Sequence, residues 1–279
     1  MHETDRVTVV VATQNRWPDL EKTLPRHRAP VVLVDNGSTD GTPQQVTRRF
    51  PDVDVVPLGE NRGAVARNVG VQRAATPYVA FADDDSWWAP GALACAAELF
   101  DAHPRLAVLA GRVLVGPQER VDPVSVEMAG SPLGTAADLP GPSILGFAAC
   151  GAIVRREAYL EAGGFDDVIF FMGEEERLTL DLASRGWGLS YVDEVVAHHH
   201  PSPSRDKHGR SVLSARNHLL TAVMRRPWPV VARRFAGALA DPDVGRDAVR
   251  AALPRLPRAV AHRRRVTPEV EANLRVLGR

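Results

Sequence analysis

An apolar run that ends in three carboxylates, Tyr78-Val79-Ala80-Phe81-Ala82-Asp83-Asp84-Asp85-Ser86-Trp87-Trp88-Ala89-Pro90-Gly91, decides the fold. Its apolar part predicts a buried strand, covered on both faces. Three adjacent aspartates cannot be packed into a core, so they are either solvated in an acidic turn or neutralised by a cation. Ligands of open α/β sheets bind beyond the carboxyl ends of the strands. Oxygen ligands without a nearby cysteine would suit a hard ion, Mg2+ or Mn2+.

The same pattern of strand, polar loop and helix repeats on both sides of this stretch. Apolar runs that predict further strands are found at residues 7–12, 31–34, 53–58 and 106–115. Helices are expected between them, for example over residues 64–74 and 90–102. The repeating order predicts an α/β fold with a mostly parallel, doubly wound central sheet. Residues 116–146 are rich in proline and glycine, and we expect an irregular segment that crosses the sheet.

Composition narrows the class of protein. The chain has 279 residues, is 44% hydrophobic and carries 34 basic and 34 acidic side chains, so no global charge favours a nucleic-acid partner. The N-terminus lacks the pattern of a signal peptide and no apolar run could span a bilayer, which predicts a cytoplasmic protein. Cys95 and Cys150 are too few for a disulfide framework or a thiolate metal site, and we expect both in the core.

Polar loops follow the other predicted strands as well. Thr13-Gln14-Asn15-Arg16 follows the first strand, and Asp35-Asn36-Gly37-Ser38 follows the second. Asn61-Arg62-Gly63, with Arg67 one turn further on, could hold a phosphate at a helix N-terminus or simply cap that helix. The sequence contains neither the glycine pattern of a dinucleotide-binding fold nor a P-loop. Phosphate would therefore have to be held in another way, and a metal on Asp83 and Asp85 would do so.

Two further charged clusters occur later in the chain. Glu174-Glu175-Glu176 follows the apolar Phe170-Phe171-Met172 and begins a helix, where the dipole favours carboxylates. Partial desolvation would also raise the pKa of a carboxyl group there and suit it to accept a proton. His198-His199-His200 follows the apolar run 195–197 and covers both faces of a strand end. One of these histidines could complete a metal site begun by Asp85.

In order and spacing, these motifs resemble the family 2 glycosyltransferases of the GT-A fold. The resemblance covers roughly residues 5–205. It is carried by Thr13-x-Asn15-Arg16, Val34-Asp35-Asn36-Gly37-Ser38-Thr39-Asp40-Gly41-Thr42, Asn61-x-Gly63-x-x-x-Arg67-Asn68-x-Gly70, Asp83-Asp84-Asp85, Gly164-Phe165-Asp166 and Glu174-Glu175.

The resemblance implies an inverting transfer of a hexosyl or deoxyhexosyl group from a nucleoside diphosphate sugar to an acceptor hydroxyl, with Mg2+ or Mn2+ on the diphosphate. The family usually has Glu-Asp where this chain has Glu174-Glu175, which maps the base to Glu175 and leaves Glu174 and Glu176 as alternatives. The nucleotide would be held by Thr13, Asn15, Arg16, Asp35, Asn61, Gly63, Arg67, Asp83 and Asp84. The metal would be held by Asp83, Asp85 and a histidine of the triplet, and which of His198, His199 and His200 meets the metal stays open.

The domain organisation is predicted as a glycosyltransferase domain over residues 1–205, with a nucleotide-sugar-binding half (1–100) and an acceptor half (101–205). A basic helical extension follows over 206–279. Its arginines form either a solvated helical face or a contact with an anionic membrane, which would make the protein peripheral to the inner face of the membrane. The resemblance leaves three classes of acceptor open: a glycan, a lipid-linked acceptor or a small molecule. Two other functions are kept open: a sugar-1-phosphate nucleotidyltransferase, and a non-catalytic sugar-nucleotide-binding protein.

Overall fold

A computed structural model of the chain describes residues 2–201 and 207–279. The described residues form a nine-stranded sheet in which the strands lie in the order β3-β2-β1-β4-β8-β6-β9-β5, with β7 paired to β6. The strands are β1 (Val7–Thr13), β2 (Val31–Asp35), β3 (Asp54–Pro57), β4 (Tyr78–Asp83), β5 (Ser86–Trp88), β6 (Leu106–Val115), β7 (Arg120–Val121), β8 (Ala152–Arg155) and β9 (Gly188–His199). Neighbours pair in parallel except at β8, β5 and β7. The predicted α/β fold with a mostly parallel sheet is confirmed.

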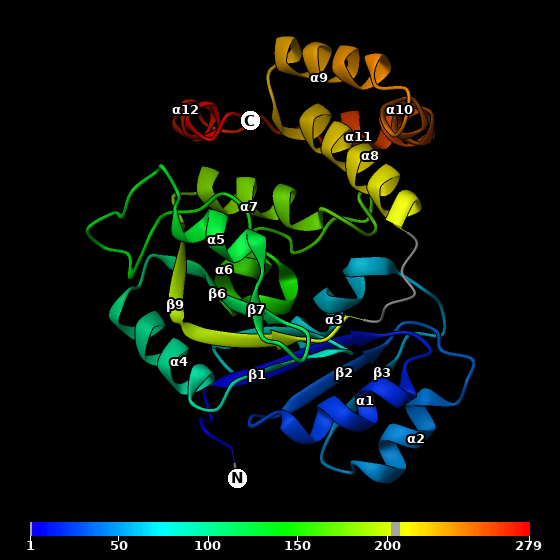
Figure 1. Ribbon diagram of the computed structural model, residues 1–279, viewed down its shortest axis with the longest axis vertical. Coiled ribbons are helices and arrows are strands. Elements are labelled where there is room, and N and C mark those ends of the chain that lie inside the picture. The colour runs from blue at the N-terminus through cyan, green and yellow to red at the C-terminus, as the bar shows by residue number, and fades with distance from the viewer. Residues whose placement is uncertain (1, 202–206) are drawn as a thin grey trace.

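Helices cover both faces of this sheet (Figure 1). Neighbouring residues of β1 show why, because Val9 packs into one apolar cluster and Val10 into the other, and both are fully buried. The first face is covered by α1 (Trp17–Thr23), α2 (Thr42–Arg49) and α4 (Ala92–Ala102), and the second by α3 (Ala66–Arg73), α5 (Pro123–Ala129), α6 (Arg156–Glu161) and α7 (Glu174–Ser184).

The register of the parallel strands brings their polar loops together. Thr13 at the end of β1 lies opposite Asp35 at the end of β2, and Ala12 lies opposite Asp83 at the end of β4. The loops that follow β1, β2 and β4 therefore leave the same edge of the sheet. This is the edge at which α/β proteins bind ligands.

Two segments differ from what the sequence predicts. The segment 116–146, expected to be irregular, contains β7 and α5. Strand β7 pairs with β6. Helix α5 begins after Asp122, whose side chain caps it by accepting a hydrogen bond from the backbone N–H of Val124. The strand before the histidines begins at Gly188 rather than at Val195, because its first residues pair in parallel with β6.

The C-terminal helices pack together on α7 (Figure 1). They are α8 (Lys207–Arg225), α9 (Trp228–Ala240), α10 (Gly245–Ala252), α11 (Leu256–Ala261) and α12 (Pro268–Val276). Buried ion pairs fix them in place: Arg225 of α8 contacts Asp181 of α7, and Arg226 contacts Glu271 of α12. The predicted boundary at residues 205 and 206 lies outside the described residues. Among those described, no helix is long and apolar enough to cross a membrane.

A strained loop leads into α7. Phe170 and Met172 have φ angles of 69° and 70°, which non-glycine residues seldom adopt. The carbonyl oxygen of Phe170 accepts a hydrogen bond from the backbone N–H of Ala64 at 2.6 Å, and the side-chain amide of Asn217 donates to the carbonyl oxygen of Met172 at 2.6 Å. The 3-10 helix η2 (Gly63–Val65) and α8 therefore hold this loop from two sides.

Gly63 makes this contact feasible and provides a test of it. A Cβ atom on Gly63 would lie 2.2 Å from the carbonyl oxygen of Phe170, whereas one on Gly59 would meet nothing within 4 Å, although both glycines have positive φ (61° and 74°). Gly59→Ala should therefore cost only about 1 kcal/mol, the backbone penalty alone. Gly63→Ala should exceed the ordinary range of about 0.5–3 kcal/mol for a point substitution. Equal losses in melting temperature for the two variants would contradict the packing described.

Candidate active site at the carboxyl edge of the sheet

A buried arginine connects the acidic end of β4 with the start of α7. The Arg67 guanidinium is 2.5 Å from Asp83 Oδ1 and 3.8 Å from Glu174 Oε1. Burial alone would lower the pKa of Arg67, but the neighbouring carboxylates Asp83, Glu174 and Glu175 outweigh it and the pKa is raised. Arg67 therefore stays charged and joins the two acidic clusters of the sequence, which are about 90 residues apart in the chain.

The loops after β1 and β2 hold each other in place through side-chain to backbone hydrogen bonds. The backbone N–H of Asn15 donates to Ser38 Oγ, and Asn15 Oδ1 accepts from the backbone N–H of Thr39, both at 2.8 Å. Asp35 Oδ2 accepts from the backbone N–H of Ser38, while Asp35 Oδ1 is buried and has no hydrogen-bond partner among residues 2–201 and 207–279. A buried acceptor without a partner is a candidate for a ligand contact.

Other predicted donor-site residues lie around this pair of loops. Asn61 donates to Gln14 Oε1 and accepts from the backbone N–H of Gly63, each at 2.8 Å, which ties the third loop to the first. Arg16 pairs with Asp19 of α1 at 3.5 Å. The three loops thus form one connected rim at the edge of the sheet.

Asp84 is directed toward the polypeptide around it. It accepts a hydrogen bond from Thr13 Oγ1 at 3.2 Å, and its backbone carbonyl oxygen accepts one from Thr23 Oγ1 at 2.9 Å. Burial and the neighbouring charges of Asp83 and Asp85 raise the pKa of Asp84 to about 7. These contacts hold the turn between β4 and β5.

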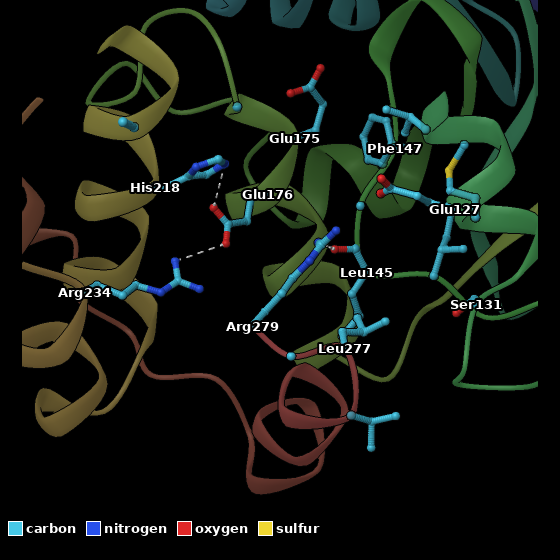
Figure 2. Close-up of a pocket in the computed structure, with 18 of the residues that line it drawn as sticks. Glu127, Ser131, Leu145, Phe147, Glu175, Glu176, His218, Arg234, Leu277 and Arg279 are labelled. Atoms are coloured by element: carbon cyan, nitrogen blue, oxygen red, sulfur yellow. Dashed lines mark hydrogen bonds and ion pairs between the residues drawn. The ribbon is translucent and has the colours of Figure 1, made fainter. Parts of the chain in front are cut away.

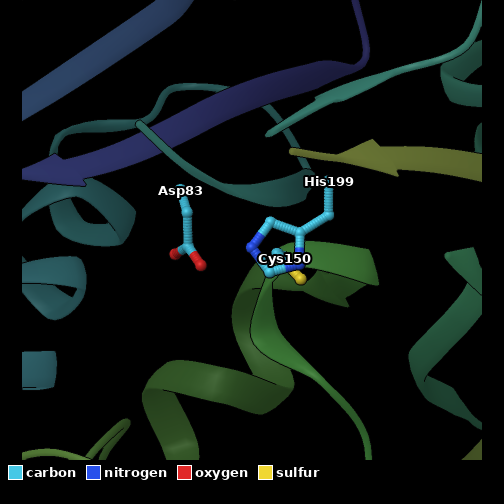
Figure 3. A group of neighbouring side chains, drawn as sticks. All are labelled: Asp83, Cys150 and His199. Carbon is cyan, nitrogen blue, oxygen red and sulfur yellow. The ribbon is translucent and has the colours of Figure 1, made fainter. Parts of the chain in front are cut away.

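Three potential metal ligands converge beside this turn (Figure 3). Asp83, Cys150 and His199 each offer a ligand atom, and the three atoms lie within 4.8 Å of one another. His199 Nε2 is also 3.2 Å from Asp85 Oδ1. The site thus combines the ends of β4 and β9 with the 3-10 helix η3 (Ala149–Gly151), which precedes β8.

The sequence leaves the choice among His198, His199 and His200 open, and in the structure the side chain of His199 lies beside Asp83 and Asp85. His198 stacks on Trp87 with ring centroids 5.1 Å apart, and its Nδ1 is 3.3 Å from Glu119. His200 contacts the same indole edge-on at 4.8 Å. Successive side chains of a strand point to opposite faces, so His198 and His200 share the face of Trp87 and His199 has the other.

Cys150 is the residue that sequence reasoning missed. It was expected to be part of the core, and it is indeed buried, but its thiol faces Asp83 and His199. Burial and the nearby carboxylates raise its pKa well above the usual value. No local motif marks this cysteine, because its neighbours Ala148, Ala149 and Gly151 are small and apolar. Only the pairing of β8 between β4 and β6 brings it to the site.

The three glutamates at the start of α7 have separate environments. Glu174 is buried against Arg67, and Glu176 lies 3.7 Å from His218 of α8 and 3.6 Å from Arg234 of α9. Glu175 accepts a hydrogen bond from the backbone N–H of Ala149 at 3.3 Å. Burial, followed by the charge of Glu174, raises the pKa of Glu175 to about 8. A carboxyl group with a pKa near neutral pH can exchange protons with a bound ligand.

Glu175 and Glu176 line a cleft of about 1140 Å³ between the sheet domain and the C-terminal helices (Figure 2). Its walls come from α5, α7, α8, α9, the segment 144–147 and the end of the chain. Apolar side chains, including Leu145 and Phe147, alternate with charged ones such as Glu127 and Arg234. A cleft of this size and mixed lining suits a ligand with polar and apolar parts.

Comparison with known proteins agrees with this geometry. Residues 8–163 match the family model described as Glycosyl transferase family 2, which is more than half of the chain. An N-acetylglucosaminyl-diphospho-decaprenol L-rhamnosyltransferase of Mycobacterium tuberculosis is 29% identical, over 76% of this chain and 81% of that protein.

Solved structures show the same fold. A mannosyltransferase from Pyrobaculum calidifontis in complex with GDP-Man and Mn2+ superposes with a TM-score of 0.61 at 26% identity, covering 93% of this chain and 74% of that one. TarS of S. aureus, in complex with UDP-GlcNAc, gives a TM-score of 0.53 at 19% identity, over 82% and 69%. The fold is that of the GT-A glycosyltransferases.

Proposed function

The chain belongs to glycosyl transferase family 2, and we propose that it transfers a sugar from a nucleoside diphosphate donor to an acceptor hydroxyl with inversion of the anomeric centre. Glycosyl transfer from a nucleotide sugar is the activity of the family. The observation that supports the inverting mechanism is Glu175, a desolvated carboxyl group on the wall of the cleft. With Glu175 as the base, one displacement is the simplest reaction.

In this reaction Glu175 accepts the proton of the acceptor hydroxyl while the oxygen attacks the anomeric carbon. The bond between that carbon and the diphosphate oxygen breaks, and the nucleoside diphosphate leaves with the electron pair. The raised pKa of Glu175 brings its basicity close to the pH of a cell, at which proton transfer is most effective. Arg67 holds Glu174 and Asp83, and so keeps the start of α7 at the end of β4.

A divalent cation is proposed to lie on Asp83, Asp85 and His199. The residues fit such an ion, because acidic and imidazole ligand atoms of separate strands converge there with His199 Nε2 only 3.2 Å from Asp85 Oδ1. When bound, the ion would stabilise the negative charge of the departing diphosphate. Asp35, Asn15 and Thr13 at the neighbouring loops are proposed to contact the nucleoside part of the donor.

Replacing Glu175 tests the base. Glu175→Gln removes the proton acceptor but keeps the size of the side chain, so the rate of nucleoside diphosphate release in the presence of acceptor should fall about 10²–10⁴-fold. Donor binding, measured by calorimetry, should be unchanged. Glu157→Gln, in the first turn of α6 and exposed, is the matched control and should retain activity. Unchanged turnover in Glu175→Gln would remove the assigned base, whereas donor binding without any nucleoside diphosphate release by the wild type would favour the non-catalytic alternative.

Replacing Asp85 tests the metal site. In the wild type, binding of GDP or UDP sugars should weaken at least about tenfold when Mn2+ is replaced by a chelator, because the cation links the diphosphate to the carboxylates. Asp85→Ala should lose this difference, whereas the exposed control Asp52→Ala should keep it. Donor binding that is equally tight with and without metal in the wild type would overturn the proposal.

The acceptor is proposed to be lipid-linked and reached at an anionic membrane surface. Residues 207–279 contain 16 basic and only 5 acidic residues, although the whole chain is neutral. Large apolar side chains lie exposed among these arginines, at Trp228, Leu239, Leu253, Val260 and Val276. Exposed arginines and apolar side chains together favour binding to anionic lipid. The rhamnosyltransferase relative has a diphospho-decaprenol in its name, which agrees with this acceptor class.

Sedimentation with liposomes tests the membrane contact. The wild type should pellet with anionic vesicles at low salt and less so as salt rises, because screening weakens the attraction. Reversing two exposed charges of the extension, Arg264→Glu with Arg265→Glu, should reduce pelleting. The same change at the exposed pair Arg48 and Arg49 of α2 should not. No pelleting of the wild type at low salt would end the hypothesis.

A further inference from the structure

Cys150 lies where the proposed cation would bind. It belongs to η3 and is only 8% exposed. Its sulfur and one ligand atom each of Asp83 and His199 lie within 4.8 Å of one another (Figure 3). It forms no disulfide. Its backbone has little room to move, because a Cβ atom on the next residue, Gly151, would lie 2.4 Å from Val113 Cγ2. The thiol is thus held at the site by tight packing of η3.

The separations in this cluster are close to those of ligands that share one ion. Ligand bonds to zinc-like ions are about 2.0–2.3 Å long, so two ligands of one tetrahedral ion lie about 3.3–3.8 Å apart. The three atoms here lie within 4.8 Å of one another before any ion draws them in. Side-chain movements of about 1 Å would bring them to these separations. With Asp85, the protein ligands would be two carboxylates, one imidazole and one thiol, and a five- or six-coordinate ion would keep positions open for water or a substrate oxygen.

We propose that Cys150 is a protein ligand of this cation, and that the site prefers borderline ions such as Co2+ and Zn2+ over Mg2+. The inference rests on the metal site of the proposed function. Thiolate and imidazole ligands favour the borderline ions, whereas oxygen ligands suit Mg2+. Aspartate ligands alone would favour hard ions, and a sulfur ligand from Cys150 would shift the preference of the site toward borderline ions. On binding, the thiol gives up its proton to solvent and the sulfur donates an electron pair to the ion.

The same helix also contacts the proposed base. The backbone N–H of Ala149 donates to Glu175 Oε1, while the side chain of the next residue, Cys150, faces the metal cluster. A ligand bond at Cys150 would therefore fix the hydrogen-bond donor that orients Glu175. The cation site and the acceptor cleft are joined by a single turn of η3.

Cobalt spectroscopy tests this ligand directly. Co2+ is titrated into the full chain, alone and with GDP or UDP, and absorption in the near ultraviolet is recorded, where thiolate-to-cobalt charge transfer is seen. The wild type should develop this band and bind Zn2+ competitively. Cys150→Ser should lose the band and bind Co2+ at least about tenfold more weakly. Replacing residues that only hydrogen-bond to metal ligands already lowers metal affinity about 10–100-fold. Cys95→Ser, on α4, is the matched control and should behave as wild type.

Each outcome separates this inference from the proposed function. Cobalt binding without a charge-transfer band, or equal affinities in Cys150→Ser and Cys95→Ser, would overturn the role of Cys150 and leave a metal-dependent transferase intact. Absence of any cation binding by the wild type, with or without nucleotide, would overturn the metal site as well. Circular dichroism checks that Cys150→Ser is folded, and Cys150→Ala, which also lacks the sulfur, should match it in cobalt absorption.

Discussion

The ion pairs of buried Arg67 with Asp83 and Glu174 are the interaction on which the rest of the site depends. Without the guanidinium, two carboxylates would face each other in a poorly solvated space, which is strongly unfavourable. Removing one partner of such a buried pair commonly costs about 3–5 kcal/mol. The positive charge of Arg67 thereby allows the acidic end of β4 and the acidic start of α7 to lie side by side. The proposed metal site and the proposed base then lie on two sides of the Arg67 guanidinium.

The proposed base, Glu175, is also held by parts of the chain that lie outside the family match, which ends at residue 163. The loop before α7 has two non-glycine residues with positive φ, and such strain persists only where the surroundings impose it. Gly63 and Asn217 do so from opposite sides. Since Asn217 belongs to α8, the C-terminal helices position Glu175 as well as lining its cleft. They are part of the catalytic unit in this account.

The sequence predicts the sheet and the edge at which the site lies, because strands that are apolar throughout and end in polar loops are a local signal. It does not predict which histidine faces the carboxylates. The register of β9 against β6 shifts within the strand. Val192 lies opposite Gly111, but the next residue of β6, Arg112, lies opposite Val196. The three residues between them reverse the alternation of side chains, so the face of His199 depends on a bulge that the partner strand imposes. Cys150 is hidden for a similar reason, since only the sheet order brings it to Asp83.

The dependence of kcat/KM on pH, measured with saturating metal and donor present in trace amounts, tests the central claim that desolvated Glu175 is the base. A base acts only when ionised, and burial places the pKa of Glu175 at about 8. The rate should therefore rise with pH through an apparent pKa close to that value and then level off. A profile that is flat from about pH 6 to pH 9, or one that rises at the ordinary pKa of a solvated glutamate near about 4.3, would contradict the account.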